Sequence, residues 1–372
     1  ECIVEDVRKV TPGTIVSFDG AGAPGVHHEF WSARGVAADG LARPFEGSEV
    51  DAVEELERIL RRSVELRMRS DVPFGAFLSG GIDSSVVVAT MQQVSTTPVR
   101  TFCIGNTTSA YDESAHAASV AKHLGCEHHT LIAEPSDMLA LVPDIAHRWD
   151  EPFADSSQIP TFLVSRLARE HVTVSLSGDG GDELFAGYNR HAWAPRLWAV
   201  ASRLPPRARK AIGALQLVGT EQWDRAFRAV GLGEAVRIPG DKLHKVAALA
   251  EVETPHELYE RLRSHWPDPS RVLAPGTEVD APRPAAALDA SFAEQMMLYD
   301  LTQYLPDDIL TKVDRASMAV SLEGRVPLLD HHVVELAWRF PTSWKIRGRT
   351  QKWILRQVLS RHVPAELFER PK

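Results

Sequence analysis

The chain has 372 residues, of which 44% are hydrophobic and 24% are charged, a composition typical of ordinary soluble globular proteins. This length exceeds what one hydrophobic core usually supports, so we expect two domains. The formal net charge of −9 argues against a general binder of nucleic acids or of anionic membranes.

The N-terminal part of the chain shows turn signals followed by one long helical pattern. Residues 1–47 are rich in Gly and Pro with short apolar runs, which predicts a hairpin and a linker. Residues 20–25 match the GxGxxG pattern of dinucleotide-binding loops, but Pro24 interrupts the match and no helix pattern follows, so we interpret them as a turn. Residues 49–69 place apolar side chains at helical spacing, which predicts an amphipathic helix.

Between residue 74 and about residue 176, short apolar runs alternate with helical patterns. The alternation predicts an α/β fold with a doubly wound parallel sheet, in which ligands bind at the carboxyl ends of the strands. The expected strands are residues 74–78, 99–104, 127–132 and 172–176. The expected helices are residues 84–94, 112–124, 136–148 and 160–170.

The C-terminal half loses the strand signal. Residues 192–290 are rich in Trp, Arg, Ala and Leu, which predicts irregular helices, and amphipathic helical patterns return in residues 292–318 and 330–362. We therefore expect a sheet core over about residues 70–190 and a helical remainder over residues 191–372. A charged run is interpreted as an ion network that anchors a helix; it comprises Asp307, Asp308, Lys312, Asp314 and Arg315.

The most informative motif is SGGIDSS at residues 79–85, between an expected strand and an expected helix. Its glycines let backbone N–H groups approach an anion, its serines add hydroxyl donors, and the helix offers its positive end. The motif lacks the lysine of the Walker loop and carries Asp83 instead. An acid beside phosphates requires a divalent cation between them, so we predict a loop that binds phosphates together with a metal ion.

A second loop of this kind follows the expected strand at residues 172–176. Its sequence, SGDGGDELFAGY at residues 177–188, again places glycines and acids at a strand end. If a helix begins near Gly181, its positive end keeps the Asp182 carboxylate ionised. Asp83 and Asp182 could then hold one Mg²⁺ ion that bridges phosphates.

The two loops together resemble the synthetase domain of glutamine-dependent asparagine synthetases. Further blocks agree in family order across nearly the whole chain: DEPFADSS at 150–157, YLPDDILTKVDR at 304–315, LEGRVPLLD at 322–330, KWILR at 352–356 and RPK at 370–372. The resemblance implies an ATP-pyrophosphatase-type (adenine nucleotide α-hydrolase-like) sheet with added C-terminal helices.

The resemblance also implies a domain organisation. Residues 1–30 resemble the last strands and exit linker of the family's N-terminal glutaminase domain. We therefore expect residues 1–47 to be a remnant of that domain with its linker and residues 48–372 to be the ATP-dependent synthetase domain. Because the sequence opens without Met and stops without a closing element, we expect a longer native chain that contains the glutaminase domain.

The implied activity is that of a carbon–nitrogen ligase. L-Aspartate, ATP and ammonia from glutamine would give L-asparagine, AMP and pyrophosphate through an aspartyl adenylate. The implied cofactors are ATP and Mg²⁺, and the implied partners are small-molecule substrates, with no nucleic acid and no membrane. The resemblance also allows a homodimer.

Site residues are carried over from the matching motifs. Lys372 corresponds to a lysine at the α-phosphate and Lys352 to one near the pyrophosphate, while Asp179 would orient the amine nucleophile or accept its proton. Asp83 and Asp182 would be the metal ligands. The implied ATP-binding residues are Leu78, Ser79, Gly80, Gly81, Asp83, Ser84, Ser85, Ile104, Ser177 and Gly178.

Cysteine usage and hydropathy indicate a cytoplasmic location. Cys2, Cys103 and Cys126 stand far apart and form no disulfide or metal spacing, which favours a reducing compartment. No apolar run approaches the roughly 18 residues of a membrane-spanning helix, and no signal peptide is visible.

Rival functions stay open. β-Lactam synthetase, lasso-peptide cyclases and amidotransferases of surface-polysaccharide clusters share these loops but act on a different carboxylate. The residues that discriminate among them are expected within residues 150–160 and 177–190, and the intact DEPFADSS block favours an ordinary amidotransferase over a cyclase. A non-catalytic nucleotide-binding module is disfavoured by the intact acids and lysines, and a tRNA-modifying enzyme would show a basic surface or catalytic cysteines.

Overall fold

The structure is a computed structural model, and it describes residues 2, 4–19, 25–107, 112–149, 151–229, 240, 243–244, 247, 252–264 and 288–369. The chain divides into two compact units. One unit is formed by Glu1–Tyr188 with Met297–Lys372, and the other by Asn189–Met296.

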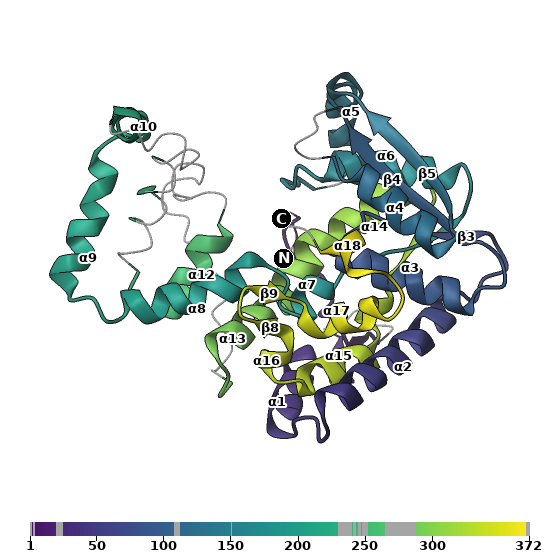
Figure 1. Cartoon of the computed structure of the whole chain (residues 1–372), viewed down its shortest axis with the longest axis horizontal. Helices are drawn as coiled ribbons and strands as arrows, with labels where there is room; N and C mark the ends of the chain where they lie inside the picture. The colour runs from purple at the N-terminus through teal and green to yellow at the C-terminus, as the bar shows by residue number, and fades with distance from the viewer. Residues whose placement is uncertain are drawn as a thin grey trace. The chain divides into compact units, whose positions relative to one another are not determined.

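A five-stranded sheet with the strand order β5-β4-β3-β6-β7 forms the core of the first unit, and Figure 1 labels its strands β3, β4 and β5. All neighbouring strands are parallel, which confirms the predicted α/β fold class. The strands are β3 Phe74–Phe77, β4 Arg100–Asn106, β5 Glu127–Ala133, β6 Val174–Leu176 and β7 Glu323–Arg325. The first four lie where the sequence predicts strands.

β7 is not among the predicted strands. Its three residues read Glu-Gly-Arg, with no β-branched or aromatic side chain. It forms because it pairs with β6 at the edge of the sheet, with Glu323 opposite Val174 and Arg325 opposite Leu176. Tertiary pairing therefore determines this strand, and its own sequence does not.

Two groups of helices accompany the sheet. α3 (Ile82–Val94) packs against α2 (Glu49–Arg67), α4 (Ser114–Leu124) and α17 (Trp353–Ser360), while α6 (Gln158–Arg169) packs against β4 and α14 (Leu310–Met318). Beneath α6, an apolar cluster fills the space to the sheet. Its buried members are Phe102, Val164, Ala168, Val172 and Leu322.

The first unit contains further helices. They are α1 (Ala33–Ala42), α5 (Pro135–Arg148), α7 (Gly181–Leu184), α15 (His331–Arg339), α16 (Thr342–Lys345) and α18 (Ala365–Phe368). The helices predicted at residues 49–69, 84–94, 112–124, 136–148 and 160–170 are all present with slightly different ends.

The linker predicted within residues 1–47 is partly wrong. The hairpin exists, as strands β1 (Thr14–Ser17) and β2 (Val26–Glu29) pair antiparallel, but α1 occupies part of the predicted linker. Gly40 is the reason that the sequence misleads: a Cβ there would lie 2.8 Å from the main chain of Trp338, so this glycine permits α1 to pack directly on α15. The turn predicted at residues 20–25 lies outside the described residues except for Gly25.

The helix predicted over residues 292–318 is interrupted. α13 (Phe292–Tyr299) continues into a π-helix, η3 (Asp300–Ile309), which leads into α14. Pro306 lies inside the π-helix, where it has no N–H to donate and its ring would clash in a regular α-helix. Wider turns of this kind accommodate such a residue.

Residues 330–362 are also less continuous than predicted. Between α16 and α17 the chain forms a short antiparallel pair, β8 (Ile346–Arg347) with β9 (Thr350–Gln351). Gly348 makes the turn with φ +64°. This hairpin places Lys352 beside the loops that follow β3 and β6, which are described below.

The second unit, in its described part, contains only helices: α8 (Asn189–Ala201), α9 (Pro206–Gly213), the 3-10 turn η1 (Ala214–Leu217), α10 (Thr220–Ala229) and α12 (Pro255–Arg263). This agrees with the irregular helices predicted there. Across the described residues, no helix is both long enough and apolar enough to cross a membrane. The predicted boundary at residue 47 stays a prediction.

Candidate active site

The two glycine-rich loops lie side by side because the strands before them are neighbours. β3 and β6 run parallel with Ala76 opposite Leu176, so both loops leave the same edge of the sheet. The chain builds the sheet outward from β3 to β4 and β5 and then returns to β6 on the other side of β3. Open parallel sheets bind ligands at such a reversal of strand order.

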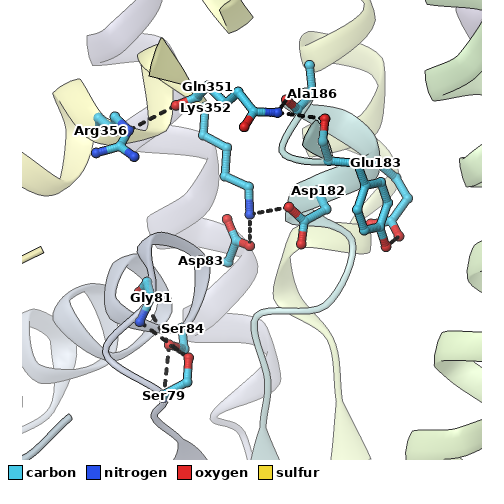
Figure 2. Close-up of polar contacts among 11 residues, drawn as sticks. Ser79, Gly81, Asp83, Ser84, Asp182, Glu183, Ala186, Gln351, Lys352 and Arg356 are labelled. Atoms are coloured by element: carbon cyan, nitrogen blue, oxygen red, sulfur yellow. Dashed lines mark hydrogen bonds and ion pairs between the residues drawn. The ribbon is translucent and has the colours of Figure 1, made fainter. Parts of the chain in front are cut away.

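Hydrogen bonds to its own serine side chains fix the conformation of the first loop. The N–H of Ser79 donates to Ser84 Oγ (3.2 Å), and the N–H of Gly81 donates to Ser79 Oγ (3.3 Å), as Figure 2 shows. Gly80 has φ +71°, a backbone conformation that favours glycine. No described side chain caps α3 at its N-cap Gly81, so the positive end of this helix faces the loop.

Close packing between the loops also depends on glycine. A Cβ at Gly178 would lie 2.6 Å from the main-chain nitrogen of Ser84, and one at Gly181 would lie 2.5 Å from Asp83 Oδ1. Side chains at these two positions would therefore push the second loop away from the start of α3. The glycines bring Asp83 and Asp182 to the same place.

Lys352 lies between these two acids. Its ammonium contacts the Asp83 carboxylate and lies 2.7 Å from Asp182 Oδ1 (Figure 2). The lysine side chain is only 8% exposed. Burial alone would lower the pKa of Lys352, but the two carboxylates outweigh that effect and raise its pKa above the ordinary value. The lysine is therefore a fixed positive charge at neutral pH.

Asp179 and Ser177 form a second polar group on the same loop. Ser177 Oγ donates to Asp179 Oδ2 at 2.7 Å. Burial raises the pKa of Asp179, partly offset by this hydrogen bond and by the positive charge of Lys312. A carboxylate with a raised pKa is a better proton acceptor than an ordinary one.

Lys312 ties the neighbouring loop at residues 151–157 to α14. Its ammonium donates to Asp155 Oδ2 (2.9 Å) and Ser157 Oγ (2.8 Å), and Arg315 lies 3.6 Å from Glu151. Burial would raise the pKa of Asp155, but the hydrogen bonds from Lys312 and Ser157 lower it below the ordinary value. The charged run predicted to anchor a helix thus anchors this loop through Lys312 and Arg315.

Glu183 is a buried acid that the sequence did not single out. Only 2% of it is exposed, and Tyr188 donates its hydroxyl to Glu183 Oε1 at 2.7 Å. Burial raises the pKa of Glu183 to about 8, although the tyrosine hydrogen bond opposes the shift. At neutral pH its carboxyl is mostly protonated, so it adds little negative charge beside Asp182.

The raised pKa of Glu183 predicts a pH-dependent stability. Between pH 4.5 and about 8 the unfolded chain loses this proton while the folded protein keeps it, so stability should fall with rising pH. The contribution approaches about 1.4 kcal/mol per pH unit. In Glu183→Gln this contribution should vanish, measured by urea unfolding from pH 5 to 8; equal pH slopes in both proteins would contradict it.

Of the residues predicted to form the site, all but one lie in the described part of the chain. Leu78 follows β3 and is buried, and Ile104 lies in neighbouring β4. Leu78 donates its N–H to the main-chain oxygen of Phe102. Lys372 lies outside the described residues, so its predicted place beside a phosphate stays a prediction.

Sequence reasoning missed two contributors: Glu183, and Gln351, whose contacts are described below. Glu183 lies inside the recognised block SGDGGDELFAGY, and Gln351 directly precedes the recognised block KWILR. A glutamine beside a motif lysine gives no signal of its own, because its role depends on two distant carbonyl groups.

A hollow elsewhere on the first unit contains none of the predicted site residues. Its volume is about 480 Å³, and it is lined by parts of α1, α2 and α15, including Arg43, Glu55 and Arg339. The loops nevertheless remain the better candidate, because they combine an open helix end with a convergent charged group.

The residues at the loops fit a phosphate chain with one divalent cation. The open end of α3 and the turned glycine loop suit anions, and two carboxylates reach the same point. Among the described residues, no group of three or more His, Cys, Asp and Glu side chains converges. Lys352 contacts one oxygen of each carboxylate, and each has a second oxygen that could bind Mg²⁺, which commonly takes one or two carboxylates together with phosphate and water.

A comparison with known families agrees with this geometry. The family model described as asparagine synthase matches residues 55–372, which include both loops and the hairpin of Lys352.

Individual relatives span more than this chain. A putative glutamine-hydrolysing asparagine synthetase of Mycobacterium tuberculosis is 34% identical over 326 residues, covering 86% of this chain and 47% of that protein. Asparagine synthetase 1 of Bacillus subtilis is 32% identical over 331 residues, covering 89% and 50%. The amidase chyE of Penicillium rubens is 24% identical over 361 residues, covering 86% and 52%. The chain thus spans about half the length of these relatives.

Proposed function

The chain belongs to the asparagine synthase family, and on that premise we propose that it forms an amide from a carboxylate, ATP and ammonia. The acceptor that we propose is L-aspartate, and the products are L-asparagine, AMP and pyrophosphate. The acceptor carboxylate attacks the α-phosphorus of ATP, pyrophosphate leaves, and ammonia then displaces AMP from the aspartyl adenylate.

One observation supports this proposal more than the others. A phosphate-type loop at the end of β3 and the paired acids Asp83 and Asp182 meet at one point, where the buried ammonium of Lys352 holds a permanent positive charge. Negative charge accumulates on the phosphates as pyrophosphate leaves, and a preorganised cation in a partly dry site stabilises that charge strongly.

We assign a separate role in the reaction to each of the site residues. The serines and main-chain N–H groups of residues 79–85 bind the phosphates, and Lys352 meets the departing pyrophosphate. Asp179, with its raised pKa, accepts a proton from the attacking amine. Lys372 is proposed at the α-phosphate. Mg²⁺ held by Asp83 and Asp182 would neutralise part of the phosphate charge.

The wider organisation is proposed on the same basis. Residues 1–47 represent the end of a glutaminase domain and its linker, residues 48–372 the synthetase domain, and the ammonia comes from glutamine in the full-length protein. We propose a cytoplasmic location for the reaction, and the family also allows a homodimer.

The test is pyrophosphate release by the purified protein with ATP, Mg²⁺ and ammonium, with and without L-aspartate. We expect aspartate-dependent release, asparagine as product, and loss of at least about 100-fold in Asp83→Asn, because the first loop then lacks its carboxylate. ATP binding without release in the presence of aspartate would contradict aspartate as acceptor, and other carboxylates would then be screened.

A further inference from the structure

Gln351 connects the hairpin of Lys352 to the second glycine loop. It ends β9 and directly precedes Lys352. Its side-chain Nε2 donates to the main-chain oxygens of Ala186 (3.0 Å) and Tyr188 (2.6 Å), as Figure 2 shows for Ala186. Both hydrogens of the amide are therefore used on the loop that also carries Asp182.

The main chain around Gln351 is held as well. Arg356 Nε donates to the carbonyl oxygen of Gln351 at 2.9 Å (Figure 2), and the N–H of Arg356 donates to the carbonyl oxygen of Lys352 at 2.9 Å. The residue is thus fixed from two sides, through its side chain by the loop and through its backbone by α17.

Two residues next to these contacts have left-handed backbone conformations. Lys352 has φ +54° and Ala186 has φ +56°, and neither is glycine. A left-handed backbone is unfavourable for a residue with a Cβ. Such conformations persist only where the surroundings impose them, and they cluster at functional sites. Gln351 directly precedes Lys352 and donates to the carbonyl oxygen of Ala186, so it connects the two strained residues.

Gly187, between the two carbonyl groups that Gln351 contacts, touches the side chain of Lys352. A Cβ at this position would overlap Lys352 Cε and would lie 2.7 Å from its Nζ. The loop segment that binds Gln351 is therefore the segment along which the lysine stem runs. A shift between β9 and this segment would move the ammonium relative to Asp83 and Asp182.

We propose that Gln351 is a positioning residue that sets the location of the Lys352 ammonium through its two side-chain hydrogen bonds. The inference rests on the proposed function, in which Lys352 meets the departing pyrophosphate. It adds a residue that acts through the lysine. A carboxylate at position 351 would face two carbonyl oxygens without a hydrogen to donate, so glutamine is required for its amide and not for its shape alone.

The test is a double-mutant cycle between positions 351 and 352. Gln351→Met keeps the length of the side chain and removes the donors, and Gln351→Glu keeps the shape. In the native background we expect both variants to lower kcat for pyrophosphate release by about 10- to 100-fold, with KM for ATP changed less than about threefold. In the Lys352→Met background the same change should cost less than about twofold, because the group it positions is absent.

A matched control removes a similar contact elsewhere. The Gln92 side chain accepts a hydrogen bond from the main-chain N–H of Val99 at 2.9 Å, at the far end of α3. Gln92→Met should lower the melting temperature without changing kcat. Equal losses of kcat for Gln351→Met with and without Lys352 would overturn the proposal, as would a loss of melting temperature alone.

A binding measurement separates this proposal from the proposed function. Calorimetry with inorganic pyrophosphate and Mg²⁺ needs no acceptor carboxylate. Coupling between positions 351 and 352 in pyrophosphate affinity, in a protein that releases no pyrophosphate with aspartate, would support Gln351 and contradict the aspartate reaction. Aspartate-dependent turnover with additive effects at the two positions would support the reaction and contradict the role of Gln351.

Discussion

Replacing Lys352 with methionine is expected to lower kcat for pyrophosphate release by about 1,000-fold and to destabilise the protein by about 3 kcal/mol at pH 8. The ammonium compensates two carboxylates that are 16% and 29% exposed, and without it Asp83 and Asp182 face each other as like charges. Methionine is unbranched like lysine, so the left-handed backbone of position 352 is strained to a similar degree in both proteins.

The pH dependence of this loss has a definite sign. The Lys352 pKa is raised in the folded protein, so the lysine contributes its full stability below its unfolded pKa and loses it only as pH rises through the folded pKa. In Lys352→Met the facing carboxylates take up protons in acid, so the two proteins should differ least near pH 5 and most near pH 8. Urea unfolding at several pH values measures both curves.

A compensating variant separates stability from catalysis. Asp83→Asn and Asp182→Asn added to Lys352→Met should recover most of the lost stability, because no uncompensated charge remains, while kcat stays at least as low as in Lys352→Met. Lys345→Met serves as a control, because Lys345 is also buried but lies over Trp338, with Nζ 5.1 Å from the ring centroid. That variant should lose stability and keep kcat. Full activity in Lys352→Met would refute the catalytic role.

Gly187→Ala is expected to lower kcat by about 100-fold while destabilising the fold by only about 1–3 kcal/mol. The added methyl group would overlap the end of the Lys352 side chain and an oxygen of Asp182. Both obstacles are ends of flexible side chains, so the backbone can stay in place while these two groups move. The change therefore affects the geometry of the charged group more than the fold.

The matched control is Gly35→Ala in α1, where the nearest atom would be 3.6 Å from the new methyl group. Since alanine is the better helix former, this variant should be as stable as the native protein or slightly more stable. Steady-state kinetics with thermal unfolding of the three proteins measures both effects. A Gly187→Ala protein with native kcat would show that the ammonium of Lys352 need not stay between Asp83 and Asp182.

The sequence predicted the parts of the fold that carry their own signal. Four of the sheet strands are short apolar runs, and both glycine loops could be placed at strand ends before the structure was known. Asp83 and Asp182 were predicted to meet because the carboxyl ends of parallel strands share one edge, and the structure brings them together.

The parts that were missed depend on partners far along the chain. β7 consists of Glu-Gly-Arg and becomes a strand only beside β6. The Gly and Pro content of residues 1–47 predicted a hairpin and linker, and the packing of Gly40 against Trp338, which lets α1 pack on α15, is invisible in the sequence. Lys352 was expected near phosphates, but its contacts with both acids and its dependence on the Gln351 amide required the tertiary structure.

The pairing of β6 with β7 also has a consequence for how the protein is made. Residues 177–322 must leave the ribosome between these two strands, which at about 5–20 residues per second takes roughly 7 to 30 s. Throughout that time the edge of β6 lacks its neighbour, and an open strand edge is a template for pairing with other chains. We expect nascent chains paused before residue 323 to need chaperones more than chains released after β7 has emerged.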